Sequence, residues 1–343
     1  MKKNIKILRL RTSEKNNFFK FIQNYWVKKV NSTLIRKVFK WQHESKDNYN
    51  FVLAKDNSKI IGIQGYIPMS HYDKALSKQN LFQVFLRVKE GKYIGTAVLL
   101  HKKIVSLCDA SFVGVVGIDE ITHKFHRWLG FKIFKMDHHF LFSKKIQKFK
   151  VAKLNKKILF KKFSIKKKNI SYDFLNLKNI NTKIDNSIFK NNYPLKSKTY
   201  LVNRYLKNPF YKYLIIQVRK ANRPNSIFVI RPIKVKKKCI IRLIDFIGSE
   251  KNFKYLHFAC IDILKKFEAE YIDIYSHGIS KKTFEKSGFI NRMNYKEIII
   301  PNYFEPFIKK NVDIFCAYKT NSKKKIKLFK GDGDGDRPSV TIS

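Results

Sequence analysis

The chain has 343 residues, which is enough for two domains of ordinary size, each with its own core. Its 44% hydrophobic and 15% aromatic residues are typical of a folded protein and exclude an intrinsically disordered one. The sequence has no run of about 18 apolar residues, so it predicts no membrane-spanning helix. The basic N-terminus, MKKNIKILRLRTSEK, lacks the long apolar core of a signal peptide, and we therefore expect a cytoplasmic protein.

A formal net charge of +48 raises the question of a polyanionic partner. A specific nucleic-acid binder usually clusters its charge and uses arginine, whereas here lysine is spread along the whole chain and arginine is scarce. We attribute the charge mainly to a bias toward A/T-rich codons and expect no nucleic-acid partner, although the charge can attract an anionic, nucleotide-linked substrate. The four cysteines lie far apart without a CxxC pair, which predicts buried free thiols and no metal site.

The first half of the chain predicts alternating strands and helices. A strand and a helix fall within residues 5–30, and a second helical or extended segment covers residues 31–46. Two apolar runs, Tyr49–Ala54 and Ile60–Pro68, are separated by the polar turn KDNSK, as in a β-hairpin. The remaining predicted elements are a strand at 80–88, a helix at 97–108, a strand at 111–118, a short helix at 120–129 and a last strand at 132–142.

The turn Val88–Thr96, VKEGKYIGT, lies between the strand Asn80–Val88 and the helix Ala97–Cys108. The first N–H groups of a helix are unpaired, and together with the helix dipole they can hold a phosphate or pyrophosphate. Gly91 and Gly95 let the backbone approach such an anion because neither carries a Cβ. The turn is therefore a candidate phosphate site, although short glycine motifs of this kind often only connect a strand to a helix.

The second half repeats this outline after a lysine-dense stretch at residues 145–170. A helix is predicted at 198–205, and three strands then lead into the turn GSEKNF, a helix at 254–267 and a strand at 271–275. Both halves end in a short helix followed by Gly-Phe, within FHRWLGF in the first half and KKTFEKSGF in the second. The chain is thus a tandem repeat whose second turn, Gly248–Asn252, lacks the second glycine and is the poorer phosphate cradle.

The order of these elements resembles that of the GNAT (GCN5-related N-acetyltransferase) superfamily. The resemblance rests on EGKYIG at 90–95, the hairpin before it and FHRWLGFK at 125–132, and it covers about residues 50–142. It implies an α/β (α+β) fold of two GNAT-like domains, each a mixed, mostly antiparallel, splayed sheet flanked by helices. We expect an N-terminal acyl-CoA-binding domain at 1–145, a basic linker at 146–170, a C-terminal GNAT-like domain at 171–330 and a Gly/Asp tail at 331–343.

The resemblance also implies where acyl-CoA binds. The expected cofactor contacts are the turn residues Val88, Gly91, Lys92, Tyr93, Ile94, Gly95 and Thr96. The loop departs from the usual pattern of the family, because Glu90 stands in place of a basic or amide residue and Tyr93 in place of a glycine. A backbone N–H in the splayed strand near Leu86–Val88 is the expected donor to the oxyanion.

In the resembled family, a tyrosine five residues before the Phe of the terminal Gly-Phe pair often protonates the departing thiolate. That position is His126 here, which we take as the candidate catalytic acid; a solvated surface histidine is the alternative interpretation. The candidate substrate contacts are polar and aromatic residues on predicted loops and strand ends: Trp41, His43, His71, Asp73, Asp245 and His277. For the four residues of the first half, a surface or packing role is the alternative interpretation.

The whole chain resembles tandem GNAT proteins of bacterial surface-polysaccharide gene clusters, through WQH at 41–43, IQGYIP at 63–68 and the terminal GDGDGDRP. The implied function is N-acylation of an amino sugar nucleotide, with acetyl-CoA or another acyl-CoA as co-substrate. Two alternatives stay open, a non-catalytic tandem GNAT-like binding module and a transferase directed at aminoacyl-tRNA or peptidoglycan. The terminal segment lacks the acidic twelfth residue of a calcium loop, so we expect it to pack against the body through Arg337 and its acids.

Overall fold

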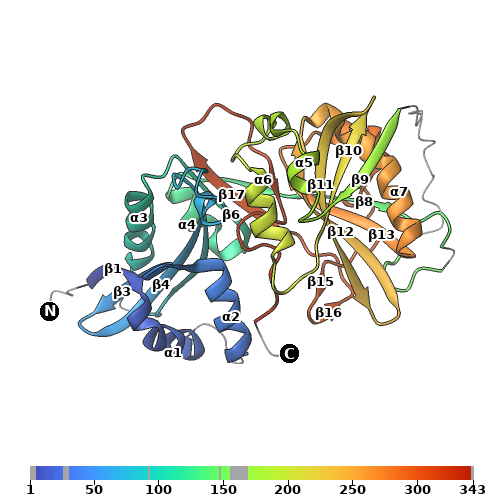
Figure 1. The fold of residues 1–343 in the computed structure, drawn as a ribbon. Coiled ribbons are helices and arrows are strands. Elements are labelled where there is room, and N and C mark those ends of the chain that lie inside the picture. Colours follow the sequence, from blue (N-terminus) through green and yellow to red (C-terminus); the bar gives the residue numbers. More distant parts are fainter. Residues whose placement is uncertain (1–4, 26–30, 92, 147, 155–168, 341–343) are drawn as a thin grey trace. The chain divides into compact units, whose positions relative to one another are not determined.

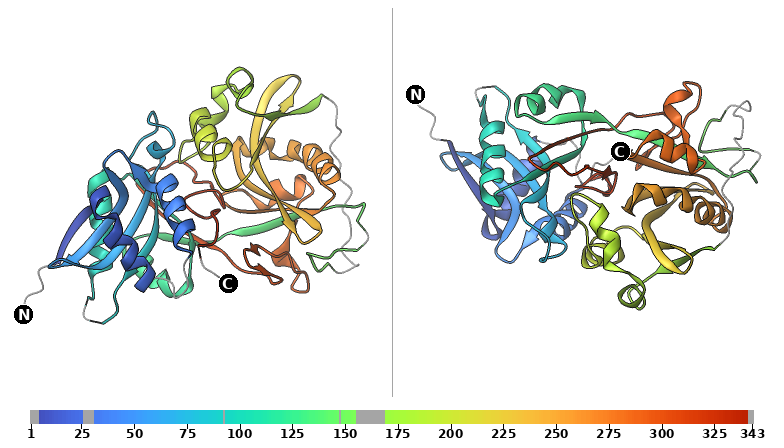
Figure 2. Two further views of the ribbon diagram at one scale, coloured as in Figure 1. Left: turned by 60° about the horizontal axis from the view of Figure 1, so that its bottom comes forward. Right: turned by 90° about the horizontal axis from the view of Figure 1, so that it is seen from above.

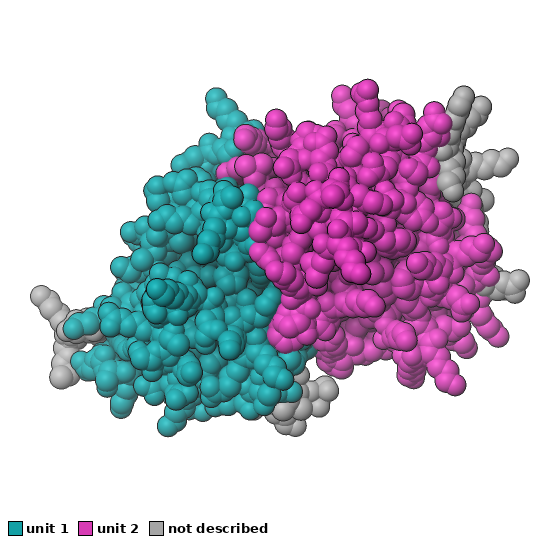
Figure 3. Space-filling view, viewed as in Figure 1, with its two compact units in different colours: residues 1–133, 317–323, 333–343 teal, residues 134–316, 324–332 magenta. Residues whose placement is uncertain are grey.

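The computed structural model describes residues 5–25, 31–91, 93–146, 148–154 and 169–340 (Figure 1). The chain forms two compact units, here called unit 1 (residues 1–133, 317–323 and 333–343) and unit 2 (residues 134–316 and 324–332) (Figure 3). The units therefore share the C-terminal part of the chain, whereas the domains expected from the sequence were consecutive. The acyl-CoA-binding role expected for the first domain stays a prediction.

The first sheet has the strand order β1-β3-β4-β5-β6-β17-β7, and β2 pairs with β3. Its strands are β1 (Ile5–Arg11), β2 (Glu44–Ser45), β3 (Asn48–Asp56), β4 (Lys59–Pro68), β5 (Asn80–Val88), β6 (Phe112–Ile118), β7 (Lys132–Lys135) and β17 (Phe315–Thr320). The α-helices that accompany it are α1 (Lys15–Tyr25), α2 (Ser32–His43), α3 (Thr96–Cys108) and α4 (His123–Trp128), with 3-10 turns at Thr12–Glu14, Met69–His71 and Glu120–Thr122.

Helices cover both faces of the first sheet. Phe51 packs against Phe18 and Phe39 of α1 and α2, with ring centroids 4.8 and 5.1 Å away, whereas its neighbour Val52 lies in the core beneath α3. Because successive residues of a strand point to opposite faces, α1 and α2 lie across the sheet from α3. In the left view of Figure 2, the blue helices lie in front of this sheet and the teal helix lies behind it.

The second sheet has the order β14-β8-β13-β12-β11-β10-β9, and β18 pairs with β13. Its strands are β8 (Asp137–Phe142), β9 (Ile170–Leu175), β10 (Leu214–Lys220), β11 (Arg223–Val235), β12 (Lys238–Gly248), β13 (Ala269–His277), β14 (Ile290–Asn291) and β18 (Leu328–Phe329); β15 (Tyr303–Phe304) and β16 (Phe307–Ile308) form a separate hairpin. The helices are α5 (Ile180–Lys183), α6 (Lys198–Leu201), α7 (Leu256–Lys266) and α8 (Lys281–Lys286), with 3-10 turns at Asn186–Asn191, Glu250–Tyr255 and Arg292–Asn294 and a π-helical turn at Val202–Leu206.

The two sheets repeat one plan, which confirms the predicted fold class. Each contains a parallel pair, β5 with β6 and β12 with β13, and the strand before each pair, β4 or β11, runs antiparallel to its neighbour. The strand beyond each parallel pair comes from the other half of the chain, β17 in the first sheet and β8 in the second. The prediction of a single strand at 132–142 was wrong, because the chain breaks at Met136, whose N–H donates to the carbonyl of Ile314 over 2.8 Å.

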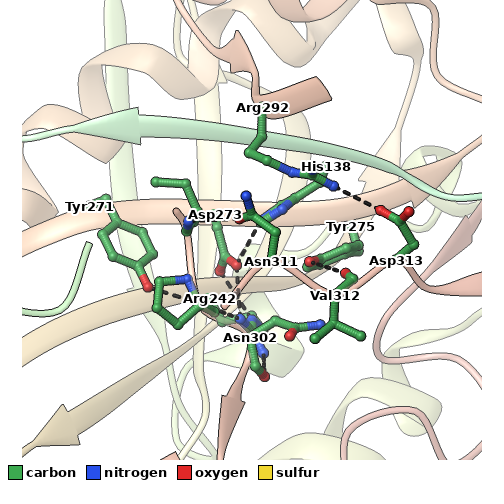
Figure 4. A network of polar contacts seen from close by, with 12 residues as sticks. His138, Arg242, Tyr271, Asp273, Tyr275, Arg292, Asn302, Asn311, Val312 and Asp313 are labelled. Atoms are coloured by element: carbon green, nitrogen blue, oxygen red, sulfur yellow. Dashed lines mark hydrogen bonds and ion pairs between the residues drawn. The ribbon is translucent and has the colours of Figure 1, made fainter. Parts of the chain in front are cut away.

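A buried ion network joins the strands of the second sheet (Figure 4). Arg242 donates to both carboxylate oxygens of Asp273 over 3.0 and 2.8 Å, and Nε2 of His138 lies 3.1 Å from the same carboxylate. Burial alone would raise the pKa of Asp273, but Arg242 and His138 lower it to about 2. Arg242 also donates to the carbonyl of Asn302, so the network connects β8, β12 and β13 to a loop.

Candidate functional site

In unit 1, the parallel strands β5 and β6 diverge after a short stretch of pairing. Asn80–Phe82 of β5 pairs with Phe112–Gly114 of β6, and no later residues of the two strands pair. Beyond this point lies a cavity of about 260 Å³. The polar side chains that line it come from β4, β5, the 3-10 turn before α4, α4 itself and the C-terminal segment: Gln64, Gln83, Asp119, Thr122, His126, Asp334 and Arg337.

A β-bulge in β5 shapes this cavity. Gly65 pairs with Val84 and Ile63 with Arg87, so the single residue Gln64 opposes both Phe85 and Leu86. Phe85 has a φ of +54°, a left-handed conformation that costs a non-glycine residue about 1–2 kcal/mol. The ring of Phe39 packs 4.7 Å from that of Phe85 and holds it in place. The predicted oxyanion donors at 86–88 thus begin within the bulge, and Leu86 lines the cavity.

The predicted phosphate loop follows β5 and ends at the N-terminus of α3. Gly95 is the N-cap, with a φ of +85°, and it provides no side-chain cap to the helix. Gly91 has a φ of +87°, and a Cβ at either glycine would meet no atom within 4 Å. Glycine is needed here for its backbone conformation, and the space beside both positions is open. Ile94 is 94% exposed, and Lys92 lies outside the described residues.

The two residues that depart from the family pattern are engaged by neighbours. The carboxylate of Glu90 accepts from Nη2 of Arg87 over 3.4 Å and is 88% exposed. The hydroxyl of Tyr93 donates to Asp56 at the end of β3 over 3.1 Å. In contrast, Oγ1 of Thr96 is buried and has no hydrogen-bond partner among the described residues. In this loop, Arg87 therefore partly offsets the negative charge of Glu90, and the N-terminus of α3 beside it is open.

His126 is held with one ring nitrogen bound to the backbone. Its Nδ1 lies 2.9 Å from the carbonyl oxygen of Thr122, so Nδ1 carries the proton and Nε2 is the acceptor. Burial lowers the pKa of His126 below its ordinary value, even though the bond to Thr122 opposes this shift. A second histidine, His101 of α3, lies 3.0 Å from the amide of Gln83, and burial lowers its pKa to about 4. Both imidazoles are therefore neutral at pH 7, and His126 is suited to accept a proton.

The substrate candidates of the first half do not line the cavity. Nε2 of His71 lies 3.1 Å from the carbonyl of Trp41, which brings these two residues together. His43 is fully buried, with Nδ1 3.3 Å from the carbonyl of Tyr66. Asp73 accepts from the N–H of Ala75 and closes a turn. These contacts give each residue a packing or turn-forming role, and their predicted contact with substrate stays a prediction.

In unit 2, the equivalent space between diverging strands is filled by the chain itself. β12 and β13 pair over Cys239–Leu243 and Ala269–Ile274, and residues 326–332, here called the plug segment, follow where pairing ends. Its strand β18 pairs with the end of β13, and the N–H of Gly331 donates to the carbonyl of Ile244 over 2.9 Å. A Cβ at Gly331 would lie 2.6 Å from atoms of Ile244 and Tyr205, so only glycine fits.

Asp245, a predicted substrate contact, holds the plug segment. Nζ of Lys196 lies 2.7 Å from Oδ1 of Asp245 and 2.9 Å from Oδ1 of Asp332, and the hydroxyl of Tyr205 donates to Asp245 over 2.8 Å. Burial alone would lower the pKa of Lys196, but the two carboxylates raise it above its ordinary value. The other candidate of this half, His277, stacks on Phe134 with ring centroids 4.1 Å apart. The structure thus gives Asp245 a structural role.

The second turn is likewise closed. Glu250 accepts from the N–H of Ser280 over 2.7 Å and from Nζ of Lys325 over 2.6 Å. Nζ of Lys327, in the plug segment, donates to the carbonyl of Gly248 over 2.9 Å. Protein groups therefore surround the turn whose counterpart in unit 1 has open space beside it.

Within the described ranges, no group of three or more His, Cys, Asp or Glu side chains is placed to hold a metal ion. None of the helices in these ranges is both long and apolar enough to cross a bilayer. Among the cavity residues, Gln64 and Gln83 were not predicted, although each is a polar residue inside an apolar strand, which is a usable signal. Asp334 and Arg337 are far from the site in sequence, and no local pattern indicates their place in it.

The sequence matches no protein-family model and none of the curated proteins. Solved structures do share the fold. A GCN5-related N-acetyltransferase from Anabaena variabilis matches 92% of this chain and 72% of its own, with a TM-score of 0.56 and 10% identity. A putative acetyltransferase from Pyrococcus horikoshii matches all of this chain and 97% of its own, with a TM-score of 0.51 and 9% identity. A probable N-acyltransferase from Enterococcus faecalis matches 91% and 72%, with a TM-score of 0.54 and 6% identity. The chain therefore has the fold of the GNAT acetyltransferases, built as two similar sheets in tandem.

Proposed function

We propose that this protein is an acyl-CoA-dependent N-acyltransferase whose working site is the cavity of unit 1. The observation that carries the proposal is the opening between β5 and β6, which has a neutral histidine on its wall. The glycine-capped N-terminus of α3 follows β5 directly and supplies N–H groups for a pyrophosphate. The GNAT fold supports this assignment, because solved structures with this fold include proteins described as acetyltransferases.

The transfer needs little chemistry from the protein. The amine nitrogen attacks the thioester carbonyl, the new C–N bond forms, and the C–S bond breaks to release the thiol of coenzyme A. The proton lost by the amine passes to Nε2 of His126 and from there to the departing sulfur, so no other reactant is required. His126 thus acts first as a base and then as the acid that the sequence suggested. Backbone N–H groups at the bulge around Leu86 stabilise the oxyanion.

Acetyl-CoA is the proposed donor, and the proposed acceptor is the amine of an amino sugar nucleotide used in surface-polysaccharide biosynthesis. The acceptor is supported by the resemblance of WQH, IQGYIP and GDGDGDRP to tandem GNAT proteins of such gene clusters. The net charge of +48 favours an anionic substrate of this kind.

Calorimetric titration of the full chain with acetyl-CoA tests the proposal. We expect saturable binding in the wild-type protein and weaker binding in Lys92→Glu, because this change adds a negative charge beside the proposed phosphate site. Lys251→Glu places the same change in the second turn and is the matched control, whose affinity should equal that of the wild type. No heat at millimolar acetyl-CoA would exclude the enzyme, and binding without release of thiol in the presence of amines would favour the non-catalytic module.

One observation favours the alternative transferase that uses aminoacyl-tRNA. A groove of about 670 Å³ in unit 2 is rich in lysine, and its cationic residues are Lys145, Lys234, Lys236, Lys237, Lys238 and Lys265. Such a surface attracts phosphate backbones through counterion release. Retention of RNA that falls steeply with salt, and that a Lys236→Glu/Lys237→Glu variant loses, would support this acceptor.

A further inference from the structure

The C-terminal segment Gly333–Val340 forms one wall of the cavity in unit 1. Gly333 lies against β5, since a Cβ there would be 3.2 Å from Cβ of Phe82. At the other end of the segment, the carbonyl of Val340 accepts from the N–H of Asn31 at the N-cap of α2. Between these two anchor points, Asp334 and Arg337 line the cavity.

The cavity is bounded by different elements on the two faces of the sheet. Leu81 packs in the core beneath α3, so Phe82, which touches the C-terminal segment, points to the opposite face. His126 lies on the α3 face, because its ring and that of His101 both contact Phe131, with centroids 5.4 and 5.6 Å away. The proposed phosphate site and the proton carrier thus belong to one face, and the C-terminal segment belongs to the other.

Arg337 is fixed in position and keeps one nitrogen available. Its Nε donates to Oδ2 of Asp334 over 3.1 Å, and its Nη1 donates to the carbonyl of Pro338 over 3.1 Å. Its guanidinium lies over the ring of Phe85 at the bulge, 4.6 Å from the centroid. No described residue accepts from Nη2. A guanidinium held in this way loses little conformational entropy when it binds an anion.

Two oxygen acceptors face the cavity from opposite sides, Asp334 from the C-terminal segment and Gln64 from the α3 face, since Gln64 pairs with Val52 of that face. Asp334 is mostly buried, with a side chain 15% exposed, and only its Oδ2 is bound to Arg337. Gln64 is 3% exposed, and its Oε1 has no hydrogen-bond partner among the described residues. A buried acceptor without a donor is unfavourable, so an incoming N–H at this point would be stabilised.

We propose that Asp334 and Arg337 bind the acceptor of the acyl transfer, and that this acceptor is an amine with an anionic group nearby, either a phosphate or a carboxylate. In the gap between the strands, the carboxylate of Asp334 on one face and Oε1 of Gln64 on the α3 face receive the N–H groups of the amine, and Nη2 of Arg337 pairs with the anion. The amine thus approaches from the face opposite to the acyl-CoA. This inference rests on the proposed function, since it assigns the second substrate of the same cavity.

Matched pairs of amines test the role of Arg337. Glucosamine 6-phosphate and glucosamine differ only in the phosphate, and L-alanine and L-alaninamide differ only in the carboxylate. With acetyl-CoA as donor, we expect Arg337→Gln to raise KM for the preferred anionic amine about 10- to 100-fold, as for a lost charge-assisted hydrogen bond. KM for its neutral partner should stay unchanged, and Arg337→Lys should recover part of the loss. If the wild type prefers glucosamine 6-phosphate over glucosamine, the anion is a phosphate, and if it prefers L-alanine over L-alaninamide, the anion is a carboxylate.

Asp334→Asn should raise KM for both members of that pair by the same factor, because the carboxylate contacts the amine that they share. Arg127→Gln is the control, since Arg127 is an exposed arginine of α4 that does not line the cavity. Acetyl-CoA affinity and the unfolding temperature should change little in all of these variants. Equal losses for anionic and neutral amines in Arg337→Gln, or a loss of acetyl-CoA affinity, would overturn the assignment.

Direct binding separates this inference from the proposed function. Absence of acetyl-CoA binding by the wild type would refute the proposed acyltransferase function. Saturation-transfer NMR with the same amines, without acetyl-CoA, would still test whether Asp334 and Arg337 bind the acceptor. Selective binding of glucosamine 6-phosphate or L-alanine over its neutral partner, lost in Arg337→Gln, supports the assignment. Equal binding of both partners, or no binding of either anionic amine, contradicts it.

Discussion

The diverging strand pairs of the two units differ in what lies between them. In unit 1, β5 and β6 part beyond Phe82 and leave a cavity of about 260 Å³. In unit 2, β12 and β13 part beyond Leu243, where β12 has a bulge at Ile244, and the plug segment lies in the gap. One architecture thus offers an open site in the first copy and a closed one in the second.

The difference shows what such a gap requires. Where two strands separate, their backbone groups lose their ladder partners and must find others. In unit 2 the chain supplies them, since Gly331 donates to Ile244, and a buried lysine with two carboxylates fastens the segment. In unit 1 a polar acceptor, Oε1 of Gln64, stays without a partner among the described residues. The open cavity of unit 1 is therefore the site that the proposed function uses.

The largest expected effect is on catalysis in the open copy. His126→Gln should lower kcat by about 10²- to 10⁴-fold, the usual contribution of a general acid–base group. His257→Gln is the matched control, because Nδ1 of His257 in unit 2 also lies 2.9 Å from a backbone carbonyl, that of Ser287. Equal losses in the two variants would contradict the assignment of the site to unit 1.

The pH dependence of the same reaction follows from the lowered pKa of His126. The neutral base is present above its ordinary pKa of 6.5 and is lost only as the pH falls through the lower value in the folded protein. We therefore expect the rate at saturating acetyl-CoA to hold from pH 7 to 6.5 and to decline below it. A decline that begins above pH 7 would argue against a buried, neutral His126.

The next effect concerns the closed copy. Lys196→Met should destabilise unit 2 by about 3–5 kcal/mol, because it leaves two buried carboxylates, Asp245 and Asp332, without their cation. The exposed Lys190→Met is the control and should change the free energy of unfolding in urea very little. Adding Asp245→Asn and Asp332→Asn to Lys196→Met should recover much of the loss. A stable single variant would show that the plug segment does not depend on this lysine.

The repeated architecture could be predicted from the sequence because its signals are local. The apolar runs, the glycine turn before Thr96 and the two Gly-Phe pairs each reflect the geometry of a few adjacent residues. The sequence did not predict that β8 lies in the second sheet and β17 in the first, because long-range packing decides which sheet a strand joins. For the same reason, residues 132–142 resemble one strand although they belong to two sheets.

The site divides in the same way. The loop at 88–96 and His126 could be proposed from spacing and resemblance. His126 lines the cavity, and the roles of both stay predictions. Asp245 attracted attention as an acid within an apolar strand, and the structure explains it by Lys196 and Tyr205, which are distant in sequence. Arg337 lines the cavity although it lies more than 200 residues after His126 in the sequence. Such long-range partners decide whether a buried polar residue serves structure or function.

A smaller effect is expected from the glycine that caps α3. Gly95→Ala should cost about 1–2 kcal/mol of stability, because alanine is strained at a φ of +85°. It should also weaken acetyl-CoA binding, since relaxation of the loop moves the N–H groups of the helix. Gly130→Ala is the matched control, with a φ of +83° at the end of α4. We expect Gly130→Ala to lose a similar amount of stability and to keep its affinity for acetyl-CoA. That result would show that the weaker binding of Gly95→Ala comes from the loop and not from backbone strain in general.

The smallest expected effect concerns the glutamate in each turn, Glu90 in unit 1 and Glu250 in unit 2. Glu250 is bound by Ser280 and Lys325 and closes the second turn, whereas Glu90 is 88% exposed and pairs only with Arg87 among the described residues. Glu90→Gln should therefore leave the unfolding temperature unchanged and tighten acetyl-CoA binding by about two- to threefold at low salt, because exposed charges interact weakly through water. The gain should vanish at high salt, and Glu120→Gln, an exposed acid before α4, should show less of it. Weaker binding by Glu90→Gln would mean that the carboxylate contributes to the site through its hold on Arg87, and the acid would then belong to the binding loop rather than oppose it.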